Sequence, residues 1–381
     1  MVSVNVILLV LTAASALLPY LKVSPLSSDI QPHYYFFLFL LVLANIMKRV
    51  ALIDVVILLY TFICIAVLLL NGGGGNECLP LISLICLVVI TSRMEDKEAS
   101  SILFVARLMG VIYLLGVVLG SLRPELLHSL VSNYRTSELR GAASFASEPS
   151  FLGFIGFSLL VIIDNLAKYK KNITDTYIPL LLVFLSGAVS VIGPTLIWLV
   201  LNNISVQDKF KFFVRFCFIL CIISGGVSYY SETLKNTRAG LIVQQAMDNG
   251  LDLVGLDKSL SNRIARGVGP VVFGVNNMLQ PQDIEALDEV VESLEISLHR
   301  ETEIKRISNF SGIFFFILGV IGGPLLAYVF LKSASEAKNS ISAFFAVCVL
   351  FFSLLSPATP YVHMVIASYS MRMNKSGREF S

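Results

Sequence analysis

Long apolar runs alternate with short polar breaks along most of the chain. Apolar runs of about 18 or more residues are typical of membrane-spanning helices. We predict twelve spans, which are, in chain order, Val2–Leu21, His33–Met47, Val50–Leu70, Cys78–Thr91, Ser101–Leu122, Ser150–Leu166, two short helices within Tyr177–Val206, a ninth span ending near Tyr230, Asn309–Leu331, Ile341–Leu355 and Pro360–Met371. The Tyr177–Val206 run is divided because about 30 residues exceed one span. We expect its break near Ser186–Pro194.

Two longer polar stretches interrupt this pattern, at residues 123–149 and 231–308. We therefore divide the chain into spans one to five (1–122), a first loop (123–149), spans six to nine (150–230), a large loop (231–308), and the last three spans with a polar tail (309–381). Within the large loop, Pro281–Ile307 carries one apolar stripe. This stripe predicts an amphipathic helix at the membrane surface or packed over a site.

The composition agrees with this pattern. Apolar residues make up 56% of the chain, charged residues 14%, and the mean hydropathy is +0.80. Soluble domains carry about 25% charged residues. The predicted fold class is an all-α polytopic membrane protein.

The six cysteines lie in or beside apolar runs, and neither polar stretch contains one. Disulfide bonds within the loops are therefore excluded. Cys217 and Cys221 share a helix face, but no histidine joins them. We expect neither a metal nor a cofactor.

The placement of lysine and arginine predicts the orientation. Alternate breaks are rich in these residues, whereas the short breaks on the other side contain only Lys22. The positive-inside rule then puts the rich side, with both termini, in the cytoplasm. Both polar stretches are expected on the outer side.

The first polar stretch ends in Arg140-Gly, followed by Glu148-Pro-Ser-Phe-Leu-Gly153. Pro149 occupies the place of a first-turn proline, which puts Glu148 at a helix N-terminus. The helix dipole favours an anionic side chain there. Glu148 is thus either a simple capping carboxylate or a functional acid held at the membrane boundary.

The second stretch contains Arg263 and Arg266, three residues apart, followed by Gly267, Gly269 and Gly274. On a helix the two arginines would share one face. Guanidinium groups bind phosphate oxygens in a fork, so this pattern is typical of an anion site. The alternative is a pair of surface arginines that are solvated or paired with acids.

These motifs resemble those of bacterial O-antigen polymerases of the Wzy type, within a wider group that includes O-antigen ligases. The spacing Arg263…Gly274 matches the family's Arg-x10-Gly pattern, and Arg140…Gly153 is two residues longer. Ligases usually carry a histidine before an asparagine in the late loop. Here Asn276-Asn277 stands at the comparable place.

The resemblance implies an enzyme of the bacterial inner membrane, with its active face in the periplasm. It would join undecaprenyl-diphosphate-linked repeat units into O-antigen, capsule or exopolysaccharide, without a cofactor because the donor is already activated. The implied partners are the lipid-linked donor and acceptor, membrane lipid and a chain-length regulator, with no nucleic acid. Residues for diphosphate and glycan binding would be Arg140, Arg238, Arg263, Arg266, Asn276 and Asn277.

The proton acceptor would be Glu148, with His363 at the start of the last span as second candidate. For His363, the alternative is a polar residue satisfied within helix packing.

Other functions stay open at this point. A ligase would transfer the glycan to a different acceptor. A flippase or other transporter is expected to show internal repeats and ionisable residues at mid-membrane, and neither is clear in this sequence. A structural or sensory membrane protein is the remaining alternative.

Overall fold

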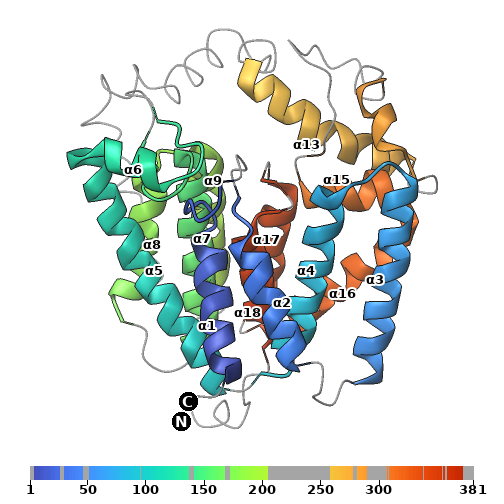
Figure 1. Ribbon diagram of the computed structural model, residues 1–381, viewed down its shortest axis with the longest axis horizontal. Helices are drawn as coiled ribbons and strands as arrows, with labels where there is room; N and C mark the ends of the chain where they lie inside the picture. The colour runs from blue at the N-terminus through green and yellow to red at the C-terminus, as the bar shows by residue number, and fades with distance from the viewer. Residues whose placement is uncertain are drawn as a thin grey trace.

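The computed structural model describes residues 4–25, 30–45, 51–94, 96–136, 141–167, 172–204, 258–277, 281–289, 307, 309–337, 339–353, 355–356 and 358–371. Within these ranges the chain is helical and contains no β-strand. The first nine helices are α1 (Val4–Leu17), α2 (His33–Asn45), α3 (Leu52–Leu70), α4 (Gly75–Thr91), α5 (Asp96–Leu122), α6 (Pro124–Leu130), α7 (Pro149–Leu166), α8 (Thr174–Leu185) and α9 (Val189–Ile204). Figure 1 shows them as a bundle of roughly parallel axes, with α6 at one end.

The later helices complete the bundle. They are α13 (Lys258–Asn276), the short η1 (Ile284–Ala286), the consecutive segments α15 (Phe310–Gly312), η2 (Ile313–Leu318), η3 (Gly319–Gly322) and α16 (Gly323–Glu336), then α17 (Ser340–Phe352) and α18 (Pro360–Ser370). The segments from α15 to α16 follow one another directly, and we call them together the rod. Ile313–Leu318 is π-helical, and Gly319, with a φ of +54°, interrupts the helical backbone.

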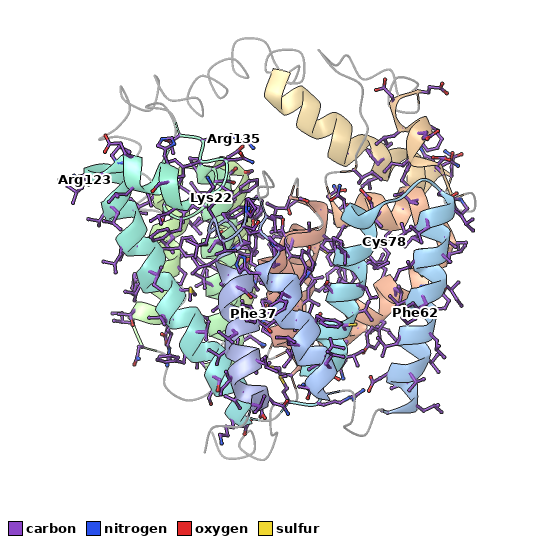
Figure 2. The ribbon with its side chains drawn as sticks, viewed as in Figure 1. Lys22, Phe37, Phe62, Cys78, Arg123 and Arg135 are labelled. Carbon is purple, nitrogen blue, oxygen red and sulfur yellow. The ribbon has the colours of Figure 1, made fainter. Side chains whose placement is uncertain are left out.

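Four helices are long and apolar enough to cross a membrane, namely Leu52–Leu70, Asp96–Leu122, Pro149–Leu166 and Phe310–Ala334. Large apolar side chains also cover the outer face of the bundle, as on α3, where Leu59, Phe62 and Ile63 are more than half exposed. Figure 2 shows Phe62 on this outer face. Contiguous exposed apolar surface is rare in a protein surrounded by water. The chain is therefore described as a helical membrane protein.

The predicted division of Tyr177–Val206 into two helices is confirmed. Helices α8 and α9 are separated by Ser186–Ala188, and Gly187 has a φ of +62° that suits glycine. Helix α9 runs parallel to α7, because Gly153 lies against Val191 near the start of both helices and Asp164 accepts a hydrogen bond from Asn202 near their ends. Helix α8 runs the opposite way beside them, with Gly156 against the Pro179 carbonyl.

Two helices form the centre of the bundle. In α7, 89% of the 18-residue apolar window is buried, and every residue of α18 is buried. The Asn165 amide donates to the Ser368 carbonyl at 2.8 Å, which joins the two helices near their C-terminal ends. Their N-terminal ends carry Glu148 and His363, so the two candidate proton acceptors are placed by the most deeply packed elements.

The described parts of both polar stretches lie at one end of the bundle, where Figure 1 shows α6 and α13. We call this end the polar end; it contains residues 20–22, 123–136, 141–148, 258–277 and 281–289. Helix α1 begins at the opposite end (Figure 1). Helix α18 starts near the polar end, where Tyr361 meets Tyr20, and finishes beside the end of α4, where Ser370 meets Thr91 at 2.6 Å.

Several predicted boundaries differ from the structure. Helix α4 begins at Gly75 rather than at the expected Cys78, because the Glu77 carboxylate accepts a hydrogen bond from the Gly74 backbone amide at 2.9 Å and caps the first turn. Lys332 lies within α16 rather than in a polar break. The predicted ninth span and most of Pro281–Ile307 lie outside the described residues.

Candidate functional site at the polar end

Residues 141–148 form a tightly held segment before α7. Ser144 has a φ of +55°, and its hydroxyl donates to the Tyr113 carbonyl of α5 at 2.6 Å. A side chain at Gly116 would collide with the Ser144 hydroxyl and the Phe145 ring, so glycine is required there. The Ala142 amide also donates to the Leu185 carbonyl at 2.8 Å. The backbone that leads to Glu148 is thus fixed to α5 and to the end of α8.

Glu148 is the N-cap residue of α7, with Pro149 in the first turn, as predicted. Its side chain makes no capping hydrogen bond. The carboxylate instead forms an ion pair with Arg135, whose Nη1 lies 3.0 Å from Oε1. Glu148 is therefore the N-cap residue by position, but its carboxylate pairs with a guanidinium group and makes no capping hydrogen bond to the helix amides.

The two members of this pair differ in burial. The Glu148 side chain is 9% exposed, whereas that of Arg135 is 52% exposed. The Arg135 amide also donates to the Ser147 carbonyl at 2.7 Å, so the backbone of Arg135 is attached beside Glu148 independently of the ion pair. Figure 2 shows Arg135 at the polar end, near Lys22. The arrangement puts a buried acid under a half-exposed cation.

Aromatic side chains connect this position to the last helix. The Phe151 ring of α7 stacks on Tyr20, with centroids 5.3 Å apart. The hydroxyl groups of Tyr20 and Tyr361 lie 3.4 Å apart. Close by on the protein surface, the ring of Tyr134 packs against His128, and burial raises the pKa of the Tyr134 phenol.

His363 lies two residues beyond Tyr361 and is fully buried. Its Nδ1 is 3.0 Å from the Tyr34 hydroxyl, and its ring lies 5.6 Å from that of Phe310. A bulky glycan cannot approach a side chain with no exposed surface. These contacts favour the interpretation of His363 as a polar residue within helix packing.

Helix α13 contains both Arg263 and Arg266, three positions apart on one helix. Its second half is docked on the start of the rod that begins at Phe310. The side-chain amide of Asn309 donates a hydrogen bond to the Gly267 carbonyl at 3.2 Å. Gly274 lies so close to the Phe315 carbonyl that a Cβ would collide with it. Glycine at position 274 thus allows the backbone of α13 to approach that of Phe315 closely.

The other predicted binding residues have different positions. Asn276 is exposed near the end of α13. Asn277 is partly buried, and its amide donates to the Phe273 carbonyl at 3.1 Å, which closes the helix end. Arg140 and Arg238 lie outside the described residues, as do the side chains of Arg263 and Arg266.

The sequence did not single out Arg135. It lies in the first polar stretch together with Arg140, and both are basic residues a short distance before Glu148. Their spacing in the sequence does not indicate which of the two contacts Glu148 at the N-terminus of α7. The contact depends on how residues 141–148 fold against α5 and α8.

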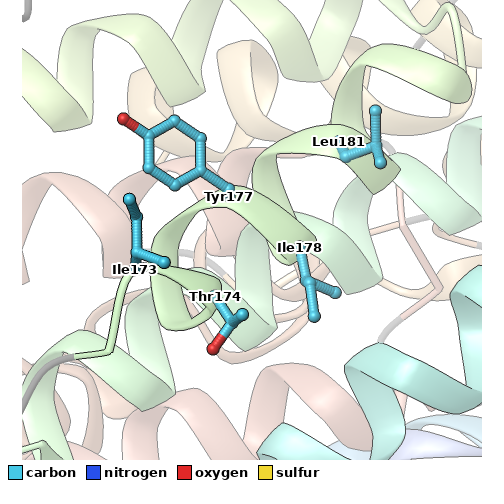
Figure 3. A pocket seen from close by; sticks show the side chains of 5 residues that line it. All are labelled: Ile173, Thr174, Tyr177, Ile178 and Leu181. Atoms are coloured by element: carbon cyan, nitrogen blue, oxygen red, sulfur yellow. The ribbon is translucent and has the colours of Figure 1, made fainter.

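A metal centre and an apolar pocket are two other kinds of site that a helical bundle can form. The described residues contain no group of three or more histidine, cysteine, aspartate or glutamate side chains that could hold a metal ion. An open apolar depression of about 420 Å³ lies on α8, lined by Ile173, Thr174, Tyr177, Ile178 and Leu181 (Figure 3). It lies at the beginning of α8, away from Glu148, and it carries no charged side chain.

The fold therefore defines a helical membrane protein with a buried acid and an exposed cation at one end. No protein-family model, curated protein or solved structure matches the chain. The assignment of a function depends on the geometry of this end and on the sequence motifs.

Proposed function

We propose that the protein is a polysaccharide polymerase of the O-antigen polymerase type. It would use lipid-diphosphate-linked oligosaccharides as donor and acceptor. The observation that carries the proposal is the pair Glu148–Arg135, at 3.0 Å, at the start of the most buried long helix. A proton acceptor beside a guanidinium group is what transfer from a diphosphate leaving group needs.

The proposed reaction uses these groups as follows. A hydroxyl of the acceptor glycan attacks the anomeric carbon of the donor, and a new C–O bond forms. The bond from that carbon to the diphosphate oxygen breaks, and its electron pair stays on the diphosphate. Glu148 accepts the hydroxyl proton, and arginines stabilise the charge on the leaving group.

The second polar stretch supports this arrangement. Helix α13 lies at the same end as Glu148 (Figure 1) and carries Arg263 and Arg266. We propose that these two arginines, with Arg140 and Arg238, bind the diphosphates at the outer membrane surface. The short breaks at the opposite end are rich in lysine and arginine. This asymmetry supports a cytoplasmic position of the termini and a periplasmic position of the polar end.

Deletion of the gene, followed by electrophoresis of surface polysaccharide, tests the function. A polymerase mutant is expected to lose the ladder of long chains but keep a single repeat unit. Complementation with the wild-type gene should restore the ladder. Loss of every repeat unit would favour a flippase, and loss of transfer of intact chains to the lipid acceptor would favour a ligase. An unchanged ladder would refute the proposal.

A further inference from the structure

We infer that Arg135 is an exchangeable ligand that pairs with Glu148, as in the structure, and transfers to the donor diphosphate when the donor binds. The transfer uncovers the Glu148 carboxylate so that it can accept the hydroxyl proton. This inference rests on the proposed function and adds a residue and a coupling step to it.

The burial of the pair is the first argument. An anion that approaches from outside meets Arg135, which is 52% exposed, before it meets Glu148, which is 9% exposed. Water reaches the half-exposed guanidinium group of Arg135, screens its attraction to the carboxylate and can replace part of the contact as the side chain turns. Arg135 can therefore leave Glu148 for an anion that binds it more strongly.

The chemistry of the competing anion is the second argument. Guanidinium forks bind phosphate oxygens through two parallel hydrogen bonds, and charge-assisted bonds of this kind are among the strongest in proteins. A diphosphate carries more charge than a single carboxylate. It therefore competes well with Glu148 for Arg135.

The backbone supplies the third argument. The bond from the Arg135 amide to the Ser147 carbonyl, at 2.7 Å, stays in place when the side chain turns. The segment before Glu148 is also held by Ser144 and Ala142. The exchange is a rotation of one long side chain on a backbone that stays in place, so Arg135 stays within reach of both ligands.

Coupling of the two events has a chemical benefit. While Arg135 holds the carboxylate, its guanidinium group occupies the place that the acceptor hydroxyl has to reach. Donor binding frees that place at the moment when the leaving group also gains its cation. The acceptor hydroxyl is therefore activated only when a donor is in place, which limits loss of the activated glycan to water.

Binding of inorganic diphosphate to the purified full-length protein in lipid nanodiscs tests the inference by calorimetry. Arg135→Ala should weaken binding by about ten-fold or more. Glu148→Gln should tighten binding by about two- to five-fold, because it removes the competitor for Arg135. Arg123→Ala is the matched control, since Arg123 is an exposed arginine at the start of α6 that makes no capping bond; it should leave binding unchanged.

The double variant Arg135→Ala/Glu148→Gln separates exchange from simple repulsion. If Glu148 competes through Arg135, the double variant binds diphosphate as weakly as Arg135→Ala alone. If Glu148→Gln tightens binding equally in both backgrounds, the effect is repulsion through space and the inference is wrong. Equal binding by wild-type and Arg135→Ala proteins also overturns it.

Binding by Arg135→Lys and polymer synthesis by Arg135→Ala keep the outcomes distinct. Arg135→Lys should recover part of the diphosphate binding, which excludes a loss of folding as the cause. Calorimetry measures binding without any polymerisation, so it tests the exchange separately from the proposed function. Diphosphate binding through Arg135 without any polymer product would refute the proposed function, whereas polymer formation with normal kcat and KM in Arg135→Ala would refute only the exchange.

Discussion

Buried carboxylates lie at both ends of the bundle, and the arginines that pair with them differ in exposure. At the end opposite the polar end, Arg107 holds Asp175 through two hydrogen bonds of 2.8 and 2.6 Å. Arg93 pairs with Asp54 at 2.6 Å. These contacts join α5 to α8 and α4 to α3, and their acids are buried. They stabilise the helix bundle, whereas Glu148 at the polar end is paired with an arginine whose side chain is half exposed.

The first prediction at this scale concerns Glu148. Glu148→Gln keeps the size of the side chain but removes its capacity to accept a proton. We expect loss of polymer while the amount of protein in the membrane is unchanged. Immunoblotting of membranes and electrophoresis of the polysaccharide measure the two quantities. Long chains at the wild-type level in this variant would exclude Glu148 as the base.

The second prediction concerns Arg107, which pairs with Asp175. The side chain of Asp175 is 2% exposed. Arg107→Ala leaves this carboxylate buried without its cation and should lower the free energy of unfolding by about 2–3 kcal/mol. Thermal unfolding in detergent measures the loss.

The control for Arg107 is the double variant Arg107→Met/Asp175→Leu. Replacing both members of a buried pair with apolar residues is often neutral, so this variant should recover most of the stability. A single variant as stable as wild type would show that the pair contributes little.

The position of Glu148 could be predicted from sequence, but its partner could not. Pro149 after a polar residue indicates a helix start by local geometry alone. The contact with Arg135 depends on the path of residues 136–147 over α5 and α8, which involves the close approach at Gly116 and the positive φ of Ser144. Such tertiary features leave no periodic pattern in a single sequence.

At the scale of elements, glycines set how closely helices approach one another. In α7, a Cβ at Gly153 would lie 2.7 Å from the Ser186 hydroxyl, and one at Gly156 would lie 2.9 Å from the Pro179 carbonyl. Small residues at helix contacts are typical of membrane proteins, where close backbone packing drives association. A glycine also allows the close contact between α13 and the rod, where Gly274 lies against Phe315.

The third prediction uses this contact. Gly274→Ala should destabilise the protein by about 1–3 kcal/mol, because the added Cβ collides with a backbone carbonyl that cannot turn away. Gly193→Ala in α9 is the control, since no atom lies within 4 Å of its added Cβ. Alanine is the better helix former, so the control should be unchanged or up to about 1 kcal/mol more stable. Thermal unfolding of both variants in detergent decides; equal behaviour would contradict the close packing of α13.

Helix existence was more predictable than helix ends. Every predicted span that falls within the described residues contains a helix, because apolar runs of this length have few alternatives in lipid. The ends moved where capping added residues, as at the first turn of α4, where Glu77 caps the Gly74 amide. The division between α8 and α9 was predictable because length and Gly193-Pro194 both indicated a break, although the break itself lies at Ser186–Ala188.

At the scale of the whole molecule, the two polar stretches share one end. The segment around Leu130 pairs with the end of α1, where the Lys22 amide donates to the Leu130 carbonyl at 2.8 Å. The segment around Ile284 attaches to the turn after α3, where its amide donates to the Asn71 carbonyl at 3.1 Å. Helices α1 and α3 both run toward this end (Figure 1). Parts of the chain far apart in sequence are thereby gathered on one side.

The fourth prediction tests this arrangement in the membrane. Single cysteines at Ser129 on α6, Val275 on α13 and Ser100 on α5 occupy exposed positions, in a background with the six native cysteines replaced by alanine. A membrane-impermeant maleimide should label Ser129→Cys and Val275→Cys in intact spheroplasts. Ser100→Cys should react only after permeabilisation. Labelling of Ser129→Cys and Val275→Cys from opposite sides would contradict the shared end.

Synthesis by the purified protein tests the central claim most directly. The wild-type chain in liposomes, supplied with lipid-diphosphate-linked repeat units and no nucleotide, should convert them into a ladder of longer lipid-linked chains and release lipid diphosphate in equal amount to the bonds formed. Glu148→Gln should form none. Repeat units that stay single with wild-type protein of confirmed fold would contradict the account.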